Sequence, residues 1–495
     1  MKTKKEQSFI QKFLSNNKNY PVLAAVASGL YPIFFYFTNN YTIVNTWGHV
    51  GYFLTMFLAL PIVVFIILHK LFGIQPLKKF QKYVLPFLNV FAFLLFMMFC
   101  YYAGLHYKVA YLSFFLAVGF SLFFYKFSKK VIVIQLILAF IGLFTLIPQL
   151  FKLANYSEEW MQQPDSIEQV IFKKKPNVYF IQPDGYANFS ELKKPNYNID
   201  YSEFETYLNK GDFKYYNDFR SNYASTLSSN SATFMMKHHH YNKGTSFSEA
   251  LYARNIIISE NPVLSIFKNN NYKTYFVTEL PYLILNKPNI GYDESNFTLD
   301  DVSYIGTGLG EPHDIISPLF KYLNEEIDQP KFFFIEIFNP GHIHGRKVDS
   351  EGIEGERKLW GESLQRANAM LYKTIDAIKE KDSNALIIIM ADHGGFVGME
   401  YTGQIYNKTQ DRDLVYSIFT STLAIHWPDN KAPKFDTNFK SAVNMFRILF
   451  SYLGEDESYL QNLQPDESFV ILKDEKPKGV YKYIDNQGKV TLKKQ

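Results

Sequence analysis

Long apolar segments fill the first 152 residues of the chain, and none of comparable length follows. Five of them can be read, approximately Tyr20–Phe37, Val50–Leu68, Tyr83–Ala103, Val109–Tyr125 and Val131–Phe151. Each approaches the ~20 residues that an α-helix needs to cross a bilayer, and the fourth is the shortest. No small-residue cleavage site follows the first segment, so the pattern predicts a retained membrane domain of five helices over residues 1–152.

Lysines between these segments predict the orientation. They gather at the N-terminus and in the second and fourth connections, as Lys2, Lys4, Lys5, Lys12, Lys70, Lys78, Lys79, Lys82, Lys126, Lys129 and Lys130. Basic loops stay in the cytoplasm. We therefore expect a multi-pass protein of the cytoplasmic membrane, with a cytoplasmic N-terminus and an extracytoplasmic domain after Phe151. If the fourth segment were instead a buried core helix, the large domain would lie on the other side.

Beyond the membrane segments the pattern alternates between short apolar runs and helical spacing. Strands are predicted over 177–182, 272–277, 332–338, 386–390 and 421–427, and helices over 262–268, 361–381 and 442–453. This alternation is typical of an α/β domain with a largely parallel sheet. We expect a juxtamembrane connector over 153–175, the α/β domain over 176–475, and a C-terminal hairpin over 476–495.

Two of these strands end in residues that bind metals. The run 386–390 is followed by Asp392-His393-Gly394-Gly395, and the run 177–182 by Asp184-Gly185. Open α/β sheets bind ligands beyond the carboxyl ends of their strands. Carboxylate oxygens and imidazole nitrogens suit Zn²⁺, Mn²⁺ or Mg²⁺. A lone strand-Asp-Gly is more often a turn, but two such ends in one sheet predict a shared site for one divalent ion.

A hydroxyl-rich stretch follows the first of these strands. Seven Ser or Thr residues occupy the thirteen positions from Ser221 to Thr233, and the end of the stretch has helical character. Each of these residues is by default a helix N-cap. A helix N-terminus also stabilises an alkoxide or a phosphoryl group, so the same position is where a nucleophilic oxygen gains most.

Further polar side chains complete the candidate site. His342 and His344 follow the strand 332–338, and Arg220 precedes the hydroxyl-rich stretch. We assign all three to substrate binding, with His342 also a candidate for proton transfer, although a histidine in a loop is often merely solvated.

Composition excludes some classes of protein. The net charge of the 495 residues is only +4, which argues against a nucleic-acid partner. Cys100 is the single cysteine, so no intrachain disulfide can form.

With these residues in view, the chain resembles the alkaline phosphatase superfamily, and within it the membrane-anchored sulfatase-like transferases: lipoteichoic acid synthases and lipid A phosphoethanolamine transferases. The resemblance implies that Asp184, Asp392 and His393 bind the metal and that Thr226 is both nucleophile and fourth ligand, with Ser225 as the alternative. It also implies that His342 faces the substrate. Thr226 is chosen because Thr226-Leu227-Ser228-Ser229 matches the Thr of the transferases, which has a Ser three residues later.

Three departures from the family pattern indicate which type of sulfatase-like enzyme the chain resembles. Phosphoethanolamine transferases carry another His soon after Asp-His-Gly and several disulfides, and both are absent here. These differences favour a single metal ion, as in the lipoteichoic acid synthase type. Sulfatases use a modified Cys or Ser followed by Pro or Ala and then Arg, and residues 221–233 contain no such Arg.

The resemblance implies a transferase that moves a phosphoryl headgroup, phosphoglycerol or phosphoethanolamine, from a membrane phospholipid to a glycan or glycolipid of the cell envelope. A covalent phospho-Thr would be the intermediate. A phosphodiesterase or phosphatase with the same site is the first alternative. A non-catalytic membrane scaffold in envelope assembly is the second.

Overall fold

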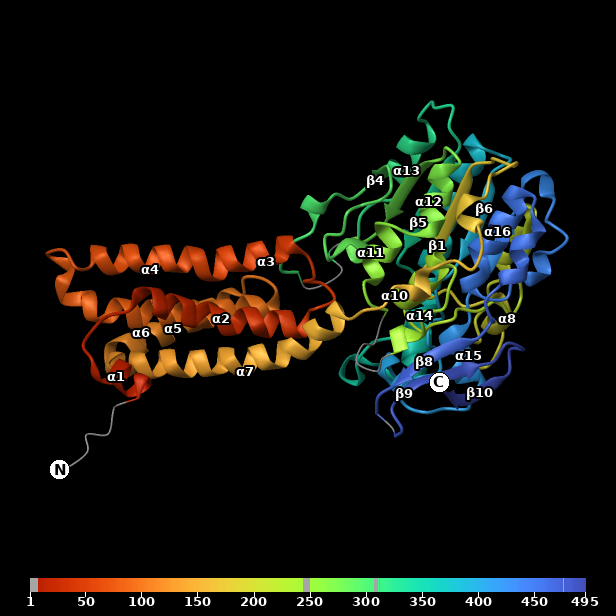
Figure 1. The fold of residues 1–495 in the computed structure, drawn as a ribbon. Coiled ribbons are helices and arrows are strands. Elements are labelled where there is room, and N and C mark those ends of the chain that lie inside the picture. Colours follow the sequence, from red (N-terminus) through yellow and green to blue (C-terminus); the bar gives the residue numbers. More distant parts are fainter. Residues whose placement is uncertain (1–7, 244–249, 307–309, 311, 475) are drawn as a thin grey trace. The chain divides into compact units, whose positions relative to one another are not determined.

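The computed structural model describes residues 8–243, 250–306, 310, 312–474 and 476–495 (Figure 1). The chain forms two compact units. The first contains the residues up to Tyr156, and the second contains most of the chain from Ser157 onward. Leu285–Lys287 also belong to the first unit.

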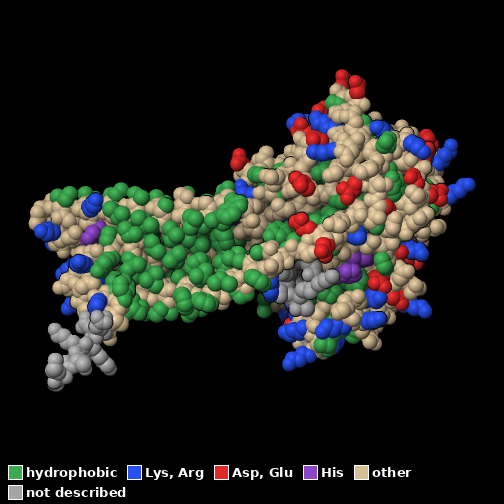
Figure 2. All heavy atoms as spheres, in the orientation of Figure 1, with side chains coloured by type: hydrophobic (Ala, Val, Ile, Leu, Met, Phe, Trp, Pro, Cys, Tyr) green, Lys and Arg blue, Asp and Glu red, His purple; other side chains and the backbone are tan. Residues whose placement is uncertain are grey.

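The first unit is helical. Its α-helices are α1 (Phe9–Ser15), α2 (Pro21–Asn39), α3 (Trp47–Leu54), α4 (Leu60–Leu71), α5 (Gln81–Tyr102), α6 (Tyr107–Phe123) and α7 (Ser128–Ala154). A π-helical turn, Thr55–Ala59, joins α3 to α4. Apolar side chains form an almost unbroken surface over these helices, as Figure 2 shows. One buried polar group pairs across three helices: the Asn89 amide donates to the Ala24 carbonyl at 2.8 Å and to Gln135 Oε1 at 2.7 Å.

Four helical segments among the described residues are long and apolar enough to cross a membrane. They are Pro21–Asn39, Trp47–Leu71, Leu77–Tyr102 and Tyr125–Ala154. The predicted fourth span is present as α6, a shorter apolar helix of 17 residues. The protein is therefore a membrane protein by the length and composition of its helices, while the fifth span and the orientation stay predictions.

A mixed sheet of seven strands forms the second unit. Its strands are β1 (Val178–Pro183), β2 (Phe213–Tyr215), β3 (Lys273–Thr278), β4 (Glu294–Ser295), β5 (Lys331–Ile337), β6 (Leu386–Met390) and β7 (Leu423–His426). Their order is β2-β7-β6-β1-β5-β3-β4. The five from β6 to β4 run parallel, and β7 is antiparallel to both β6 and β2.

The helices of the second unit are α8 (Phe189–Leu192), α9 (Ser202–Lys210), α10 (Thr226–Met235), α11 (Ala253–Ile258), α12 (Pro262–Asn269), α13 (Ile316–Leu323), α14 (Gly352–Lys381), α15 (Arg412–Phe419) and α16 (Met445–Gly454). One core cluster joins one face of the sheet to α9, α13, α14 and α15. Phenylalanines of α10, α12 and α16 contact those on the other face. The sheet is therefore covered on both faces, which explains why its central strands are almost entirely apolar.

Aromatic residues at matching positions stabilise the central strands. Tyr179, Phe333 and Tyr275 lie side by side on β1, β5 and β3. The centroids of their stacked rings are 4.9 and 4.4 Å apart. Much of the high aromatic content is thus core packing within the sheet.

Two further segments surround this core. The connector between the units contains two 3₁₀ turns, Glu159–Met161 and Ile167–Gln169. At the C-terminus β9 (Gly479–Ile484) and β10 (Val490–Lys494) pair as a hairpin, and β8 (Ser468–Leu472) adds a third antiparallel strand.

Candidate metal centre

Two neighbouring parallel strands bring the predicted metal ligands together. β1 and β6 pair directly, and Asp184 and Asp392 each lie just beyond a carboxyl end. One ligand atom from each of Asp184, Asp392 and His393 falls within 4.8 Å of the others. His393 Nε2 lies 3.4 Å from Asp184 Oδ1 and 3.3 Å from Asp392 Oδ2.

The backbone fixes the Asp392 carboxylate. Its Oδ1 accepts hydrogen bonds from the amides of Gly185 at 3.1 Å and His393 at 3.0 Å. Its Oδ2 is buried and has no hydrogen-bond partner among the described residues, and the same is true of Asp184 Oδ1. Two adjacent buried carboxylate oxygens without donors are costly unless a cation neutralises them.

The imidazole of His393 is held in the form that binds metals. Its Nδ1 lies 2.8 Å from the Gly394 carbonyl, which can only accept a hydrogen bond, so Nδ1 carries the proton. Nε2 faces the two carboxylates and is the ring nitrogen available to a metal ion. Two carboxylate oxygens and one imidazole nitrogen form a ligand set suited to one divalent cation, so the residues fit the predicted ion without selecting among Zn²⁺, Mn²⁺ and Mg²⁺.

Thr226 lies beside this set at the start of a helix. It is the first residue of α10, with Ser225 as the N-cap. Thr226 Oγ1 is 3.3 Å from His393 Nε2, and the Thr226 hydroxyl also interacts with the Asp184 carboxyl, where it acts to lower the pKa. Ser225 Oγ is buried and has no partner among the described residues. Of the two hydroxyls, the Thr226 hydroxyl is the one that contacts the metal-binding residues and lies in the field of the helix N-terminus.

Burial raises the pKa of the Asp184 carboxyl well above its usual value, and the nearby Asp392 carboxylate raises it further. Protons therefore compete with the metal ion for Asp184. We expect the metal affinity to fall as the pH is lowered through the raised pKa of Asp184, with proton release on binding in that range. Calorimetric titration with Mn²⁺ in buffers of different ionisation enthalpy, over about pH 5 to 8, measures this release. A pH-independent affinity without proton release would contradict it.

A close backbone contact positions Asp184. Gly185 has a φ of +65°, and a Cβ at this position would lie 2.1 Å from the Gly341 carbonyl oxygen. The Gly341 amide in turn donates to the Asp184 carbonyl at 2.8 Å. The strand-Asp-Gly signal therefore reflects a real steric requirement for glycine.

We expect Gly185→Ala to destabilise the protein by about 2 kcal/mol or more, because the φ is unfavourable for alanine and the backbone must move. Thermal unfolding in detergent measures the loss. Gly345→Ala is the matched control, since its nearest neighbour, Thr402 Oγ1, would be 3.9 Å from the added Cβ. Equal unfolding temperatures for the two variants would refute the steric argument.

The structure places His342 next to the metal-binding residues. The centroids of the His342 and His393 rings are 6.2 Å apart. His342 Nδ1 donates to the Ile343 carbonyl at 2.7 Å, which leaves Nε2 free to accept a proton. The loss of surrounding water lowers the pKa of His342, so the neutral imidazole is favoured.

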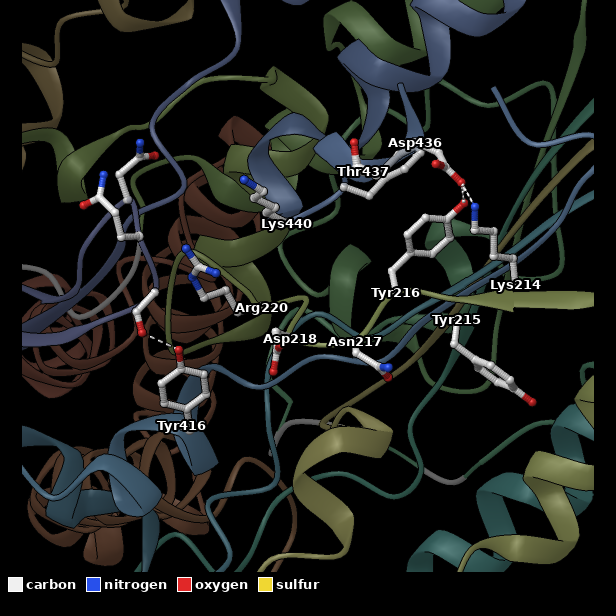
Figure 3. A pocket seen from close by; sticks show the side chains of 14 residues that line it. Lys214, Tyr215, Tyr216, Asn217, Asp218, Arg220, Tyr416, Asp436, Thr437 and Lys440 are labelled. Atoms are coloured by element: carbon white, nitrogen blue, oxygen red, sulfur yellow. Dashed lines mark hydrogen bonds and ion pairs between the residues drawn. The ribbon is translucent and has the colours of Figure 1, made fainter. Parts of the chain in front are cut away.

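His344 and Arg220 lie elsewhere. His344 Nδ1 pairs with Glu356 Oε1 at 2.9 Å, and the His344 amide donates to the other oxygen of the same carboxylate. Arg220 donates to the carbonyls of Asp466 and Asp485, and it lines a separate pocket (Figure 3). Neither side chain has a contact with Asp184, Asp392 or His393 among the described residues, and their roles in substrate binding stay predictions.

Sequence analysis missed two residues that support the site. Trp360 on α14 donates its Nε1 hydrogen to the Gly341 carbonyl at 2.9 Å. The Phe396 ring packs against both His342 and His393, with centroids 5.8 and 5.5 Å away, and Phe396 has a φ of +59°. Trp360 belongs to a helix distant in sequence, and no local pattern signals the left-handed backbone of Phe396. Both became visible only in the fold.

Comparison with known proteins gave matches in structure alone. No family model and no curated protein matches the sequence. Among solved structures, the C-terminal periplasmic domain of EptC from Escherichia coli in complex with Zn is 11% identical. That match covers 65% of this chain and 96% of that one, with a TM-score of 0.44.

Two other similar solved structures are a transferase domain and a sulfatase. The periplasmic domain of the phosphoethanolamine transferase EptC from Campylobacter jejuni is 14% identical over 57% of this chain and 90% of that one, with a TM-score of 0.36. A putative sulfatase from Bacteroides fragilis is 14% identical over 65% and 87%, with a TM-score of 0.42.

Proposed function

We propose that this protein is a metal-dependent transferase that moves a phosphoryl headgroup from a membrane phospholipid to a hydroxyl group of a cell-envelope glycan or glycolipid. The α/β domain would act on the outer face of the cytoplasmic membrane. The observation that supports this most is the contact of Thr226 Oγ1 with both His393 and Asp184 at the N-terminus of α10.

The chemistry takes two displacements at phosphorus. In the first, Thr226 Oγ forms a bond to the phosphorus of the phosphodiester, and the bond from phosphorus to the diacylglycerol oxygen breaks. The Thr226 proton leaves, and the diacylglycerol oxygen gains one. In the second, the acceptor hydroxyl loses its proton, its oxygen bonds to the phosphorus, the bond to Thr226 Oγ breaks, and Thr226 Oγ regains a proton.

Each group of the chain has a separate task in this scheme. Asp184, Asp392, His393 and Thr226 would hold one divalent ion, which when bound supplies positive charge that lowers the pKa of the Thr226 hydroxyl and stabilises phosphoryl oxygens. The free amides at the start of α10 add positive potential where the phosphoryl group sits. His342 Nε2 is the atom that exchanges a proton with the leaving or entering oxygen.

A membrane domain also suits this substrate. A phospholipid donor remains in the bilayer, so an enzyme that uses its headgroup gains from attachment to the same membrane. The apolar helices of the first unit provide that attachment.

Mass spectrometry of the solubilised full-length protein tests the proposal. Wild type and Thr226→Ala are incubated with Mn²⁺ and mixed phospholipids and then analysed intact and as peptides. We expect a phosphoryl adduct of headgroup mass on the Thr226 peptide of the wild type alone, and its mass identifies the donor.

Other outcomes separate the alternatives. Turnover of phospholipid with transient adduct and no product on added glycans would identify a phosphodiesterase, in which water resolves the intermediate. Neither adduct nor bound metal would refute the enzymatic proposal and favour the scaffold.

A further inference from the structure

A pocket separate from the metal centre lies in the α/β domain, beside the edge strand β2. It has a volume of about 620 Å³ and is formed by residues that follow β2, by Tyr416 of α15, by the loop 436–440 and by the turn 486–488 (Figure 3). This volume is in the range of pockets that bind small molecules. It contains none of the metal-binding residues.

The charges in this pocket are unbalanced. Lys214 pairs with Asp436, which also accepts a hydrogen bond from Tyr216 at 3.0 Å. Arg220 and Lys440 remain, with Asp218 as the other acidic side chain of the lining. In the described part of the chain, neither of these two cations has a carboxylate partner within ion-pair distance.

Arg220 is the more informative of the two cations. Its side chain is only 4% exposed, and its Nε is buried with no hydrogen-bond partner among the described residues. Its Nη2 is satisfied by carbonyl oxygens, which carry no net charge. A buried guanidinium without a counter-ion is unfavourable, so an anion bound in this pocket would be stabilised by the charge of Arg220.

The rest of the lining suits a sugar better than a bare anion. Asn217, Asn486 and Gln487 supply exposed amides, whereas Tyr216, Tyr416 and Phe439 are buried in the wall of the pocket. Amides both donate to and accept from the hydroxyl groups of sugars. A free phosphate would use the cations and leave these groups without a role.

The residues that follow β2 lie at the same end of the sheet as the metal centre. β2 and β6 run in the same direction because β7 is antiparallel to each of them. The residues after β2 and the residues after β6 therefore lie at the same end of the sheet, where these two strands have their carboxyl ends. Strands are ~4.8 Å apart, so the two strand ends, with β7 between them, are separated by ~10 Å.

We propose that this pocket binds a saccharide unit that carries an anionic group, a carboxylate or a phosphate, with Arg220 and Lys440 contacting the anion. Its position beside the metal centre makes it a subsite for the glycan acceptor. The acceptor role rests on the proposed transferase function, whereas the binding itself does not.

Binding is measured by isothermal titration with the full-length protein in detergent, in the Thr226→Ala background so that no turnover occurs. The probes are glucose 1-phosphate, galacturonate, glucose and inorganic phosphate. We expect saturable binding of the two acidic sugars, at least tenfold tighter than glucose or phosphate.

Lys440→Gln is the decisive variant, since Lys440 is exposed and its replacement leaves the fold intact. We expect it to weaken the binding of acidic sugars about tenfold, the usual worth of a charge-assisted hydrogen bond. Lys434→Gln, an exposed lysine of the same region outside the pocket, is the matched control and should bind as the parent does.

Three results would overturn the proposal: no saturable binding of either acidic sugar, equal affinity for phosphate and glucose 1-phosphate, or equal binding by the Lys440 and Lys434 variants. Failure of the transferase function is distinguishable, because the Thr226 adduct forms in the absence of any acceptor. An adduct without sugar binding refutes this inference alone, and sugar binding without an adduct refutes the transferase alone.

Discussion

Thr226→Ala is expected to lower the turnover of phospholipid by at least about 10³-fold, because the group that forms the covalent bond is lost. Thr226 is almost fully buried, and its Oγ1 contacts His393 and Asp184. The helix that begins at this residue does not depend on the hydroxyl, since no side chain caps it. Turnover is measured from diacylglycerol release, and the unfolding temperature should change little.

Ser225→Ala is the matched control for this experiment. Ser225 is the neighbouring hydroxyl and the alternative nucleophile, yet its buried Oγ has no partner among the described residues. Its removal should change turnover less than about tenfold. Thr226→Ser, which retains a hydroxyl, should keep measurable activity. If Ser225→Ala abolished turnover and Thr226→Ala did not, the nucleophile would be Ser225.

The proximity of Asp184, Asp392 and His393 could be anticipated because both strands that carry them are marked in the sequence. Asp184 and Asp392 come two residues after the ends of the apolar runs 177–182 and 386–390, and parallel strands bring their carboxyl ends to the same end of the sheet. That β1 and β6 are direct neighbours is decided by packing among seven strands. No local pattern contains this order, so the sequence could predict a shared site but not its distances.

Loop and edge residues were the least predictable. His344 shares its loop with His342, but its imidazole pairs with Glu356, which lies twelve residues later on α14. The Arg220 guanidinium donates hydrogen bonds to the carbonyls of Asp466 and Asp485, which flank the C-terminal strands. Each contact joins a loop to another element of the fold, and spacing within one loop does not reveal it.

The strand β7 shows a related limit. Its apolar run was predicted, but the β6–β7 connection holds α15 and still ends in an antiparallel strand. Because β7 is antiparallel, β2 pairs with it as the edge strand, and residues of and after β2 line the pocket described above. A reading of the sequence as repeated parallel units gives no reason to expect a pocket at this position.

Asp392→Asn is expected to weaken metal binding by at least about 100-fold while the protein stays folded. The asparagine Oδ1 can keep the hydrogen bonds from the Gly185 and His393 amides. In wild type, Asp392 Oδ2 lies 3.3 Å from His393 Nε2. In the variant, the asparagine amide nitrogen takes the place of Oδ2 and can donate a hydrogen bond to His393 Nε2. The variant therefore loses a ligand and a negative charge without losing its backbone contacts.

This substitution separates metal binding from folding. In metal-free protein, the loss of one of two adjacent buried carboxylates removes repulsion, so the unfolding temperature should equal or exceed that of wild type. Adding Mn²⁺ at about 100 times its Kd should stabilise wild type by about 2.7 kcal/mol and the variant hardly at all. Asp349→Asn, at an exposed carboxylate paired with Arg346, should respond as wild type does. Equal stabilisation of wild type and Asp392→Asn by Mn²⁺ would mean that the ion binds elsewhere. Asp392 is held by amides from the loops after β1 and after β6, so an ion in the proposed site would contact its carboxylate.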